Sequence, residues 1–144
     1  MSSAVVVDPK GTLATEAHQR FGSVVMEFEA AGTIPRRSVV LLNTSLKVAK
    51  AATGTAAAGT TLGIALEAAT AGRVVQVVVF GPVDQVPADG AIAAGSPVIA
   101  STTTAGSVIA KAAPTTGEGL GWAPVAASGG YVTVWVNRSI GGIT

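Results

Sequence analysis

The feature that most constrains the fold is an internal repeat. Residues 62–74 (LGIALEAATAGRV) return as residues 120–132 (LGWAPVAASGGYV), and 7 of the positions carry the same amino acid without a gap. Similar apolar blocks upstream extend the two copies to about residues 39–80 and 97–138. A period of this length indicates one supersecondary unit that occurs twice in the chain.

The residue types favour strands over helices. The chain holds 21 Val and 16 Thr against 7 Leu, together with 18 Gly. Beta-branched side chains fit pleated strands, and glycine fits tight turns. We predict a three-residue hairpin loop that ends at Gly72 and another that ends at Gly130, each glycine supplying a positive φ. The strongly β-prone segments 74–80 and 132–136 follow these loops.

The two units are joined by residues 81–95, which contain two prolines and three glycines. This composition predicts a surface crossover with one turn of helix near Ala91. Each unit alone would expose the edges of its sheet, so the two are expected to close together. We therefore predict an all-β fold: a small β-barrel or β-sandwich built from two related strand-hairpin units.

The first 22 residues differ from the rest, because they hold the only histidine and a short apolar run ended by Asp8-Pro9. Chain termini are often loose unless they dock on a partner. We predict an extended N-terminal arm over residues 1–22 and one β-domain over residues 23–144.

Residues 24–29 alternate between two faces and predict the first strand of that domain. The face expected to meet the core carries Val24, Met26 and Phe28. Glu27 and Glu29 share the other face, roughly 6–7 Å apart, a spacing that could suit the carboxylate pair of a glycoside hydrolase. We expect instead a solvated strand face or one that meets a basic partner.

Composition excludes several classes of protein. The net charge is +1 and only 12% of residues are charged, which argues against a nucleic-acid binder. With 0 Cys, disulfides, thiolate metal sites and cysteine nucleophiles are excluded. The mean hydropathy is +0.55, but glycines, serines and Pro97 interrupt the longest uncharged run, residues 90–110. We expect a soluble protein without a membrane span.

The inventory of catalytic residues is thin. His18 is the only imidazole, and it lies in the predicted arm, where nothing would fix its geometry. Residues 54–61 have the glycine spacing of a phosphate-binding loop, but Thr60 stands where the lysine is needed. We expect no enzyme activity, no metal site and no cofactor.

Two other groups of side chains are candidates for contacts with a partner. Trp122 and Trp135 lie inside apolar strands and are expected to pack in the core or in a subunit interface. The densest positive group is either a solvated strand edge or a surface that meets an acidic partner. It consists of Arg36, Arg37, Lys47 and Lys50.

Residues 33–138 resemble the capsid decoration proteins of tailed phages, which are also called head-stabilising or cement proteins. The resemblance is carried by the runs 74–100 and 120–136, with their patterned valines and glycines. It implies a β-barrel-like homotrimer on the outer surface of the virion capsid, at three-fold and quasi-three-fold positions. The implied partner is the major capsid protein, and synthesis would take place in the host cytoplasm. The family brings no catalytic residues.

In several members of that family the N-terminal segment contacts the shell, and here this maps loosely onto residues 2–21. An apolar segment can add a strand to an exposed sheet edge. The capsid-binding residues expected on this basis are Ala4, Val5, Val6, Val7, Arg20 and Phe21.

Two other functions stay open at this point. One is a carbohydrate- or receptor-binding module of a phage head fibre or tail, which would need exposed aromatic side chains on loops. The other is a small hydrolase that uses Glu27 and Glu29.

Overall fold

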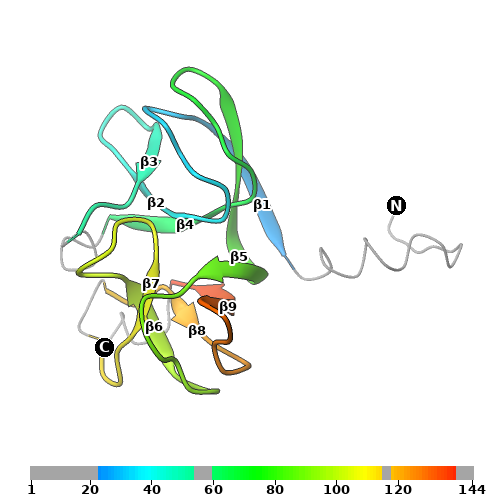
Figure 1. Ribbon diagram of the computed structural model, residues 1–144. Coiled ribbons are helices and arrows are strands. Elements are labelled where there is room, and N and C mark those ends of the chain that lie inside the picture. Colours follow the sequence, from blue (N-terminus) through cyan, green and yellow to red (C-terminus); the bar gives the residue numbers. More distant parts are fainter. Residues whose placement is uncertain (1–22, 54–59, 115–117, 139–144) are drawn as a thin grey trace, which may run out of the picture.

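The computed structural model describes residues 23–53, 60–114 and 118–138, so the predicted arm lies outside the described residues. Within these ranges the chain has strands and turns and no helix, which confirms the all-β fold class (Figure 1). The strands are β1 (Val24–Glu29), β2 (Val39–Leu42), β3 (Val48–Lys50), β4 (Thr61–Ala65), β5 (Val74–Pro87), β6 (Pro97–Ala100), β7 (Val108–Ala110), β8 (Gly121–Trp122) and β9 (Tyr131–Asn137).

The strands form one antiparallel sheet that curls into a half-barrel (Figure 1). Its order is β3-β2-β4-β5-β9-β8-β6-β7, and β1 pairs with β5 off this path. The two halves are connected alike: β2 pairs with β3 and β4, as β6 pairs with β7 and β8. β4 then pairs with β5, as β8 pairs with β9. The two copies of the repeat therefore have the same strand connectivity.

The hairpin glycines have the backbone conformation that the sequence predicts. Gly72 and Gly130 both have a φ of +85°. Both turns are one residue shorter than expected. The amide of Arg73 donates to the carbonyl oxygen of Thr70, and Ser128 already pairs with Tyr131 in the second hairpin, where Gly129 also has a positive φ, +63°. Two consecutive left-handed residues make the two-residue turn that matches the twist of a hairpin.

β5 joins the two halves of the sheet. Its first part pairs with β1 and β4, and its second part pairs with β9, from Phe80 opposite Asn137 to Pro87 opposite Tyr131. The prediction of a crossover beginning at residue 81 is therefore wrong, and the described residues form no helical turn near Ala91. Pro82 and Pro87 fit into a strand here because, beyond Phe80, β5 pairs with β9 alone among the described strands, so this part of β5 has one free edge.

β1 has an orientation that differs from the expected one. Val24 and Met26 are 49% and 48% exposed, and among the three expected core residues only Phe28 packs against a core cluster. The reason is the position of β1, which pairs with β5 alone among the described strands and so lies at an edge of the sheet. An edge strand has neighbours on one side only, and its alternation does not show which face is covered.

Two aliphatic clusters form the core. The larger one takes residues from both copies of the repeat, including Val39, Ile64, Val98 and Val134. The smaller one is formed by the first copy together with the segment before it. Its buried members are Ala30, Ile34, Val40, Val48, Ala65, Val75 and Val77. No aromatic side chain is among the buried core residues of the described chain. Valine and isoleucine thus provide the close packing that aromatic rings provide in many domains.

A glycine occupies the same position of each repeat copy for a steric reason. A Cβ atom at Gly63 would lie 2.1 Å from the carbonyl oxygen of Val78 on β5. A Cβ atom at Gly121 would lie 2.0 Å from the carbonyl oxygen of Trp135 on β9. Both clashes involve backbone, which cannot swing aside as a side chain can. The Leu-Gly pair that marks the repeat therefore marks two close approaches of strands.

We expect Gly63→Ala and Gly121→Ala each to cost about 3 kcal/mol or more of unfolding free energy, the upper end for overpacking. Gly32→Ala is the matched control, because nothing lies within 4 Å of a Cβ atom there. Urea denaturation followed by circular dichroism measures all three. Equal midpoints for Gly63→Ala and Gly32→Ala would contradict this account.

A carboxylate ties the β6–β7 loop to the end of β5. Asp89 accepts hydrogen bonds from the hydroxyls of Ser101 and Thr103. The Ser101 oxygen in turn accepts from the amides of Thr103 and Thr104. The hydroxyl of Ser101 first, and then that of Thr103, lower the pKa of Asp89 below its ordinary value of 3.8.

A lowered pKa in the folded state means that ionised Asp89 stabilises the fold above pH 3.8 and that this contribution is lost as the pH falls toward the lowered pKa. We expect the stability of Asp89→Asn to fall less than that of the parent protein as the pH is lowered. Urea midpoints between about pH 6 and pH 2.5, a span that brackets a lowered aspartate pKa, measure this. Glu27→Gln, a change at an exposed carboxylate on β1, is the control, and identical pH profiles for Asp89→Asn and the parent would refute the role.

Candidate interaction surface

The four basic residues singled out from the sequence do not form one free positive patch. Arg36 and Lys50 are exposed. Arg37 turns inward, is only 16% exposed and pairs with Asp84 at 3.4 Å. The ammonium of Lys47 lies 3.1 Å from the carboxylate of Glu29. A contact of these residues with a partner stays a prediction, and two of the four charges already have acidic neighbours.

The remaining candidates from the sequence lie apart from one another or outside the described residues. Glu27 and Glu29 are exposed on β1, and Glu29 is engaged by Lys47. Ala4 to Val7, His18, Arg20 and Phe21 lie outside the described residues. Among residues 23–53, 60–114 and 118–138, no three His, Asp or Glu side chains gather in a way that could hold a metal ion. No helix of that part of the chain is long and apolar enough to cross a membrane.

An aromatic row runs across four strands on the outer side of the second half of the sheet. Pro82 on β5 lies opposite Trp135 on β9, which lies opposite Trp122 on β8, which lies opposite Pro97 on β6. All four residues are half-buried. We call them, together with Phe80, the aromatic row.

The rings of the aromatic row contact one another. Trp122 and Trp135 are stacked, with centroids 6.4 Å apart and an interplanar angle of 29°. Phe80 meets Trp135 edge-on, with centroids 6.2 Å apart. Such pairs add stabilisation beyond the area they bury. Of the two alternatives for the tryptophans, packing in the core is wrong, because Val134 and Val136 take the inward positions on either side of Trp135. Packing in a subunit interface stays a prediction.

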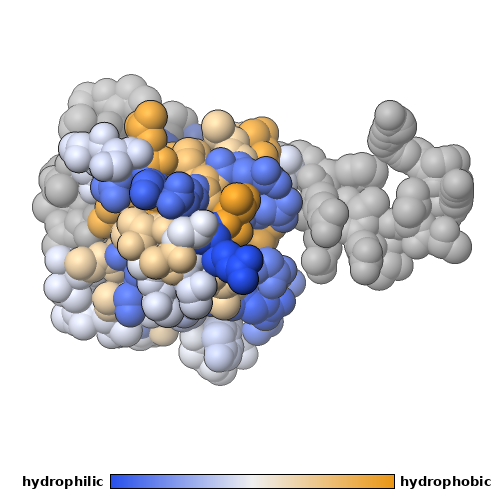
Figure 2. All heavy atoms as spheres, turned by 90° about the horizontal axis from the view of Figure 1, so that it is seen from above, coloured by the Kyte–Doolittle hydropathy of each residue, from blue (hydrophilic) through white to orange (hydrophobic). Residues whose placement is uncertain are grey.

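The exposed side chain of Val24 on β1 extends the aromatic row. Val24 lies opposite Phe80 in the β1–β5 ladder, and both are exposed. Figure 2 shows that hydrophobic side chains reach the surface between hydrophilic ones on the face seen there. Exposed apolar groups that adjoin one another indicate a surface that meets a partner.

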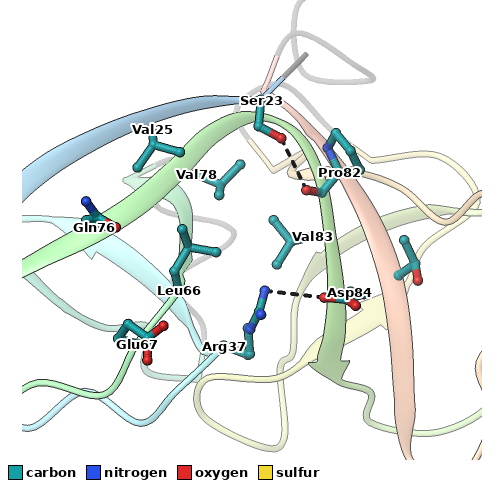
Figure 3. Close-up of a pocket in the computed structure, with 11 residues that line it drawn as sticks. Ser23, Val25, Arg37, Leu66, Glu67, Gln76, Val78, Pro82, Val83 and Asp84 are labelled. Carbon is teal, nitrogen blue, oxygen red and sulfur yellow. Dashed lines mark hydrogen bonds and ion pairs between the residues drawn. The ribbon is translucent and has the colours of Figure 1, made fainter. Parts of the chain in front are cut away.

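A hollow of about 210 Å³ opens beside the bend of β5 (Figure 3). In Figure 3, Arg37 and Asp84 point toward one another at one end, and Ser23 lies beside Pro82 at the other. The sequence did not reveal this hollow. Its lining is made of Ser23, Val25, Arg37, Leu66, Glu67, Gln76, Val78, Pro82, Val83, Asp84 and Thr133.

Comparison with known proteins gives a likeness of fold. No protein-family model matches the sequence, and no curated protein matches it either. The N-terminal base of the head fibre gp8.5 of bacteriophage phi29 has a similar structure, with a TM-score of 0.55 and 16% sequence identity. The match covers 81% of this chain and 95% of that one. At this identity the comparison shows that the two chains share a fold.

Proposed function

We propose that this chain is a structural protein of a phage head: a decoration protein that binds the outer surface of the expanded capsid as a homotrimer and stabilises it. The observation that carries the proposal is the fold shared with a phage head-fibre base over 81% of this chain. The similarity of residues 33–138 to capsid decoration proteins supports it independently. Three-fold and quasi-three-fold positions of the shell are the proposed binding sites.

The surface of the domain fits such a role. The aromatic row and the exposed side chains Val24 and Met26 offer apolar area that copies of the chain or the shell could cover. Aromatic residues and methionine are enriched in protein interfaces. In this proposal β1 and the aromatic row meet a neighbouring copy, and the arm of residues 1–22 meets the major capsid protein.

Stabilisation of the shell would follow from mass action. A protein that binds only the expanded state favours that state by about 2.7 kcal/mol per site when its concentration is 100 times its Kd. A trimer presents three copies of each contact, so weak single contacts combine into a slow-dissociating attachment. The shell gains resistance to internal pressure without any chemical step.

A second candidate is a carbohydrate- or receptor-binding module of a phage head fibre or tail. The observation that favours it is that the similar structure belongs to a head fibre, together with the outward position of Trp122 and Trp135. The two tryptophans lie on strands and their rings contact each other, so they do not form a platform on loops.

Purified protein mixed with empty expanded and unexpanded shells tests the proposal by cryo-electron microscopy. We expect density at three-fold positions of the expanded shells only, and a raised melting temperature of those shells. A variant without residues 1–20 should stay trimeric and attach more weakly. Bare shells would contradict the decoration role, and binding to host cells or glycans by the same sample would favour the second candidate.

The trimer makes a separate prediction about β1. Val24→Ser with Met26→Ser should raise the dissociation constant of the trimer at least tenfold, which is about 1.4 kcal/mol, because both changes remove apolar area from the interface. Light scattering over a dilution series measures it. Val125→Ser changes an exposed valine outside β1 and is the control. It should leave the mass of the oligomer unchanged over the same dilution series. A parent protein that is monomeric at micromolar concentration would refute the trimer.

A further inference from the structure

The hollow beside β5 is lined by a half-buried arginine, Arg37, that has one buried donor without a partner. The Nε atom of Arg37 is buried and has no hydrogen-bond partner among the described residues. The ion pair with Asp84, at 3.4 Å, is longer than the usual charge-assisted hydrogen bond. Buried N–H groups in folded proteins are nearly always paired. The Nε donor of Arg37 therefore has no acceptor among the described residues.

The backbone on both sides of this ion pair is strained. Arg37 has a φ of +63°, and Gln85, next to Asp84, has a φ of +58°. They are two of the three non-glycine residues with positive φ that the described chain contains. Left-handed backbone at such residues persists when its surroundings hold it, and it concentrates at binding sites. Glycine at either position would adopt the positive φ without the steric cost of a Cβ atom.

The charges of the hollow select the chemistry of its ligand. An anion that approaches Arg37 would also approach Asp84 and Glu67, and a cation would meet Arg37. A neutral amide avoids both conflicts, because its oxygen accepts and its N–H donates. The donors of Arg37 and the acceptors of Asp84 lie next to each other, which is the complement of the N–H and C=O groups of one extended residue (Figure 3).

The size and the apolar part of the hollow narrow the ligand further. Pockets for drug-sized molecules have about 300–1,000 Å³, so a smaller hollow takes a group the size of one residue. The aliphatic side chains of Val25, Leu66 and Val83 line it beside the polar pair. They provide a surface for a small aliphatic side chain next to the amide.

We propose that this hollow binds one residue of an extended polypeptide segment from a partner protein. The carbonyl oxygen of that residue accepts from the guanidinium of Arg37, and its N–H donates to Asp84. Val25 belongs to β1, so a segment that continues past the hollow meets the edge strand of the sheet. The inference rests on the hollow alone and holds whether or not the chain decorates a capsid.

Nuclear magnetic resonance titration of the full-length protein tests the site with three small probes: N-acetylvaline N-methylamide, acetate and methylammonium. We expect saturable shifts of the backbone amides of Gln76, Asp84 and Thr133 with the amide probe only. Arg37→Met should weaken the binding of this probe at least tenfold. Arg36→Met changes the neighbouring exposed arginine and should bind the probe as the parent does.

A second variant keeps the test decisive if Arg37→Met does not fold. Asp84 is 43% exposed, so Asp84→Ala removes the acceptor with little effect on the core. This variant should also bind the amide probe at least tenfold more weakly. Tighter binding of acetate or of methylammonium would overturn the proposal, as would the absence of any saturable shift. Shells that stay bare while the amide binds would refute the decoration role and leave this inference standing.

Discussion

Two close approaches of neighbouring strands determine the shape of this domain. At Gly63 and at Gly121 the backbone of the next strand lies where a methyl group would overlap a carbonyl oxygen. The two sites lie at the same position of the repeat, so both halves of the sheet are drawn together in the same way. The curl that results lets one sheet enclose an aliphatic core on its inner side. Valine and isoleucine side chains fill most of this core.

The shared strand β5 follows from this arrangement. The 14 residues of β5 pair with β4 in one half and with β9 in the other, and the strand bends between them (Figure 3). The bend carries Gly81, with a φ of +111°, and the left-handed Gln85. It is also where the hollow opens, because side chains on a bent strand diverge. The left-handed backbone and the half-buried side chain of Arg37 thus lie where the two repeat units meet.

Much of the fold could be predicted from the sequence, and the failures have physical causes. The repeat, the β class and the positive φ of Gly72 and Gly130 are local properties, and the sequence carries them directly. The continuation of β5 past residue 81 was missed because proline and glycine mark turns on average, while here the prolines lie in a part of β5 that pairs with β9 alone among the described strands. The exposure of β1 depends on which strands cover it, and alternation alone carries no such information. The hollow needs Arg37 and Asp84 to meet from distant parts of the chain, and neither residue forms a motif.

The outer surface of the domain has features that folding does not require. A polar side chain at Val24 would be better solvated, and glycine at residue 37 would relieve the backbone. The stacked tryptophans could be replaced by threonine or valine, which suit the outer side of a strand. Each of these residues lowers the stability of the isolated domain. A partner that covers them would bury the apolar area and supply an acceptor for the unpaired donor. Because the costs are spread over a broad face and a separate hollow, the surface suits contact with extended protein surfaces more than the capture of a small substrate.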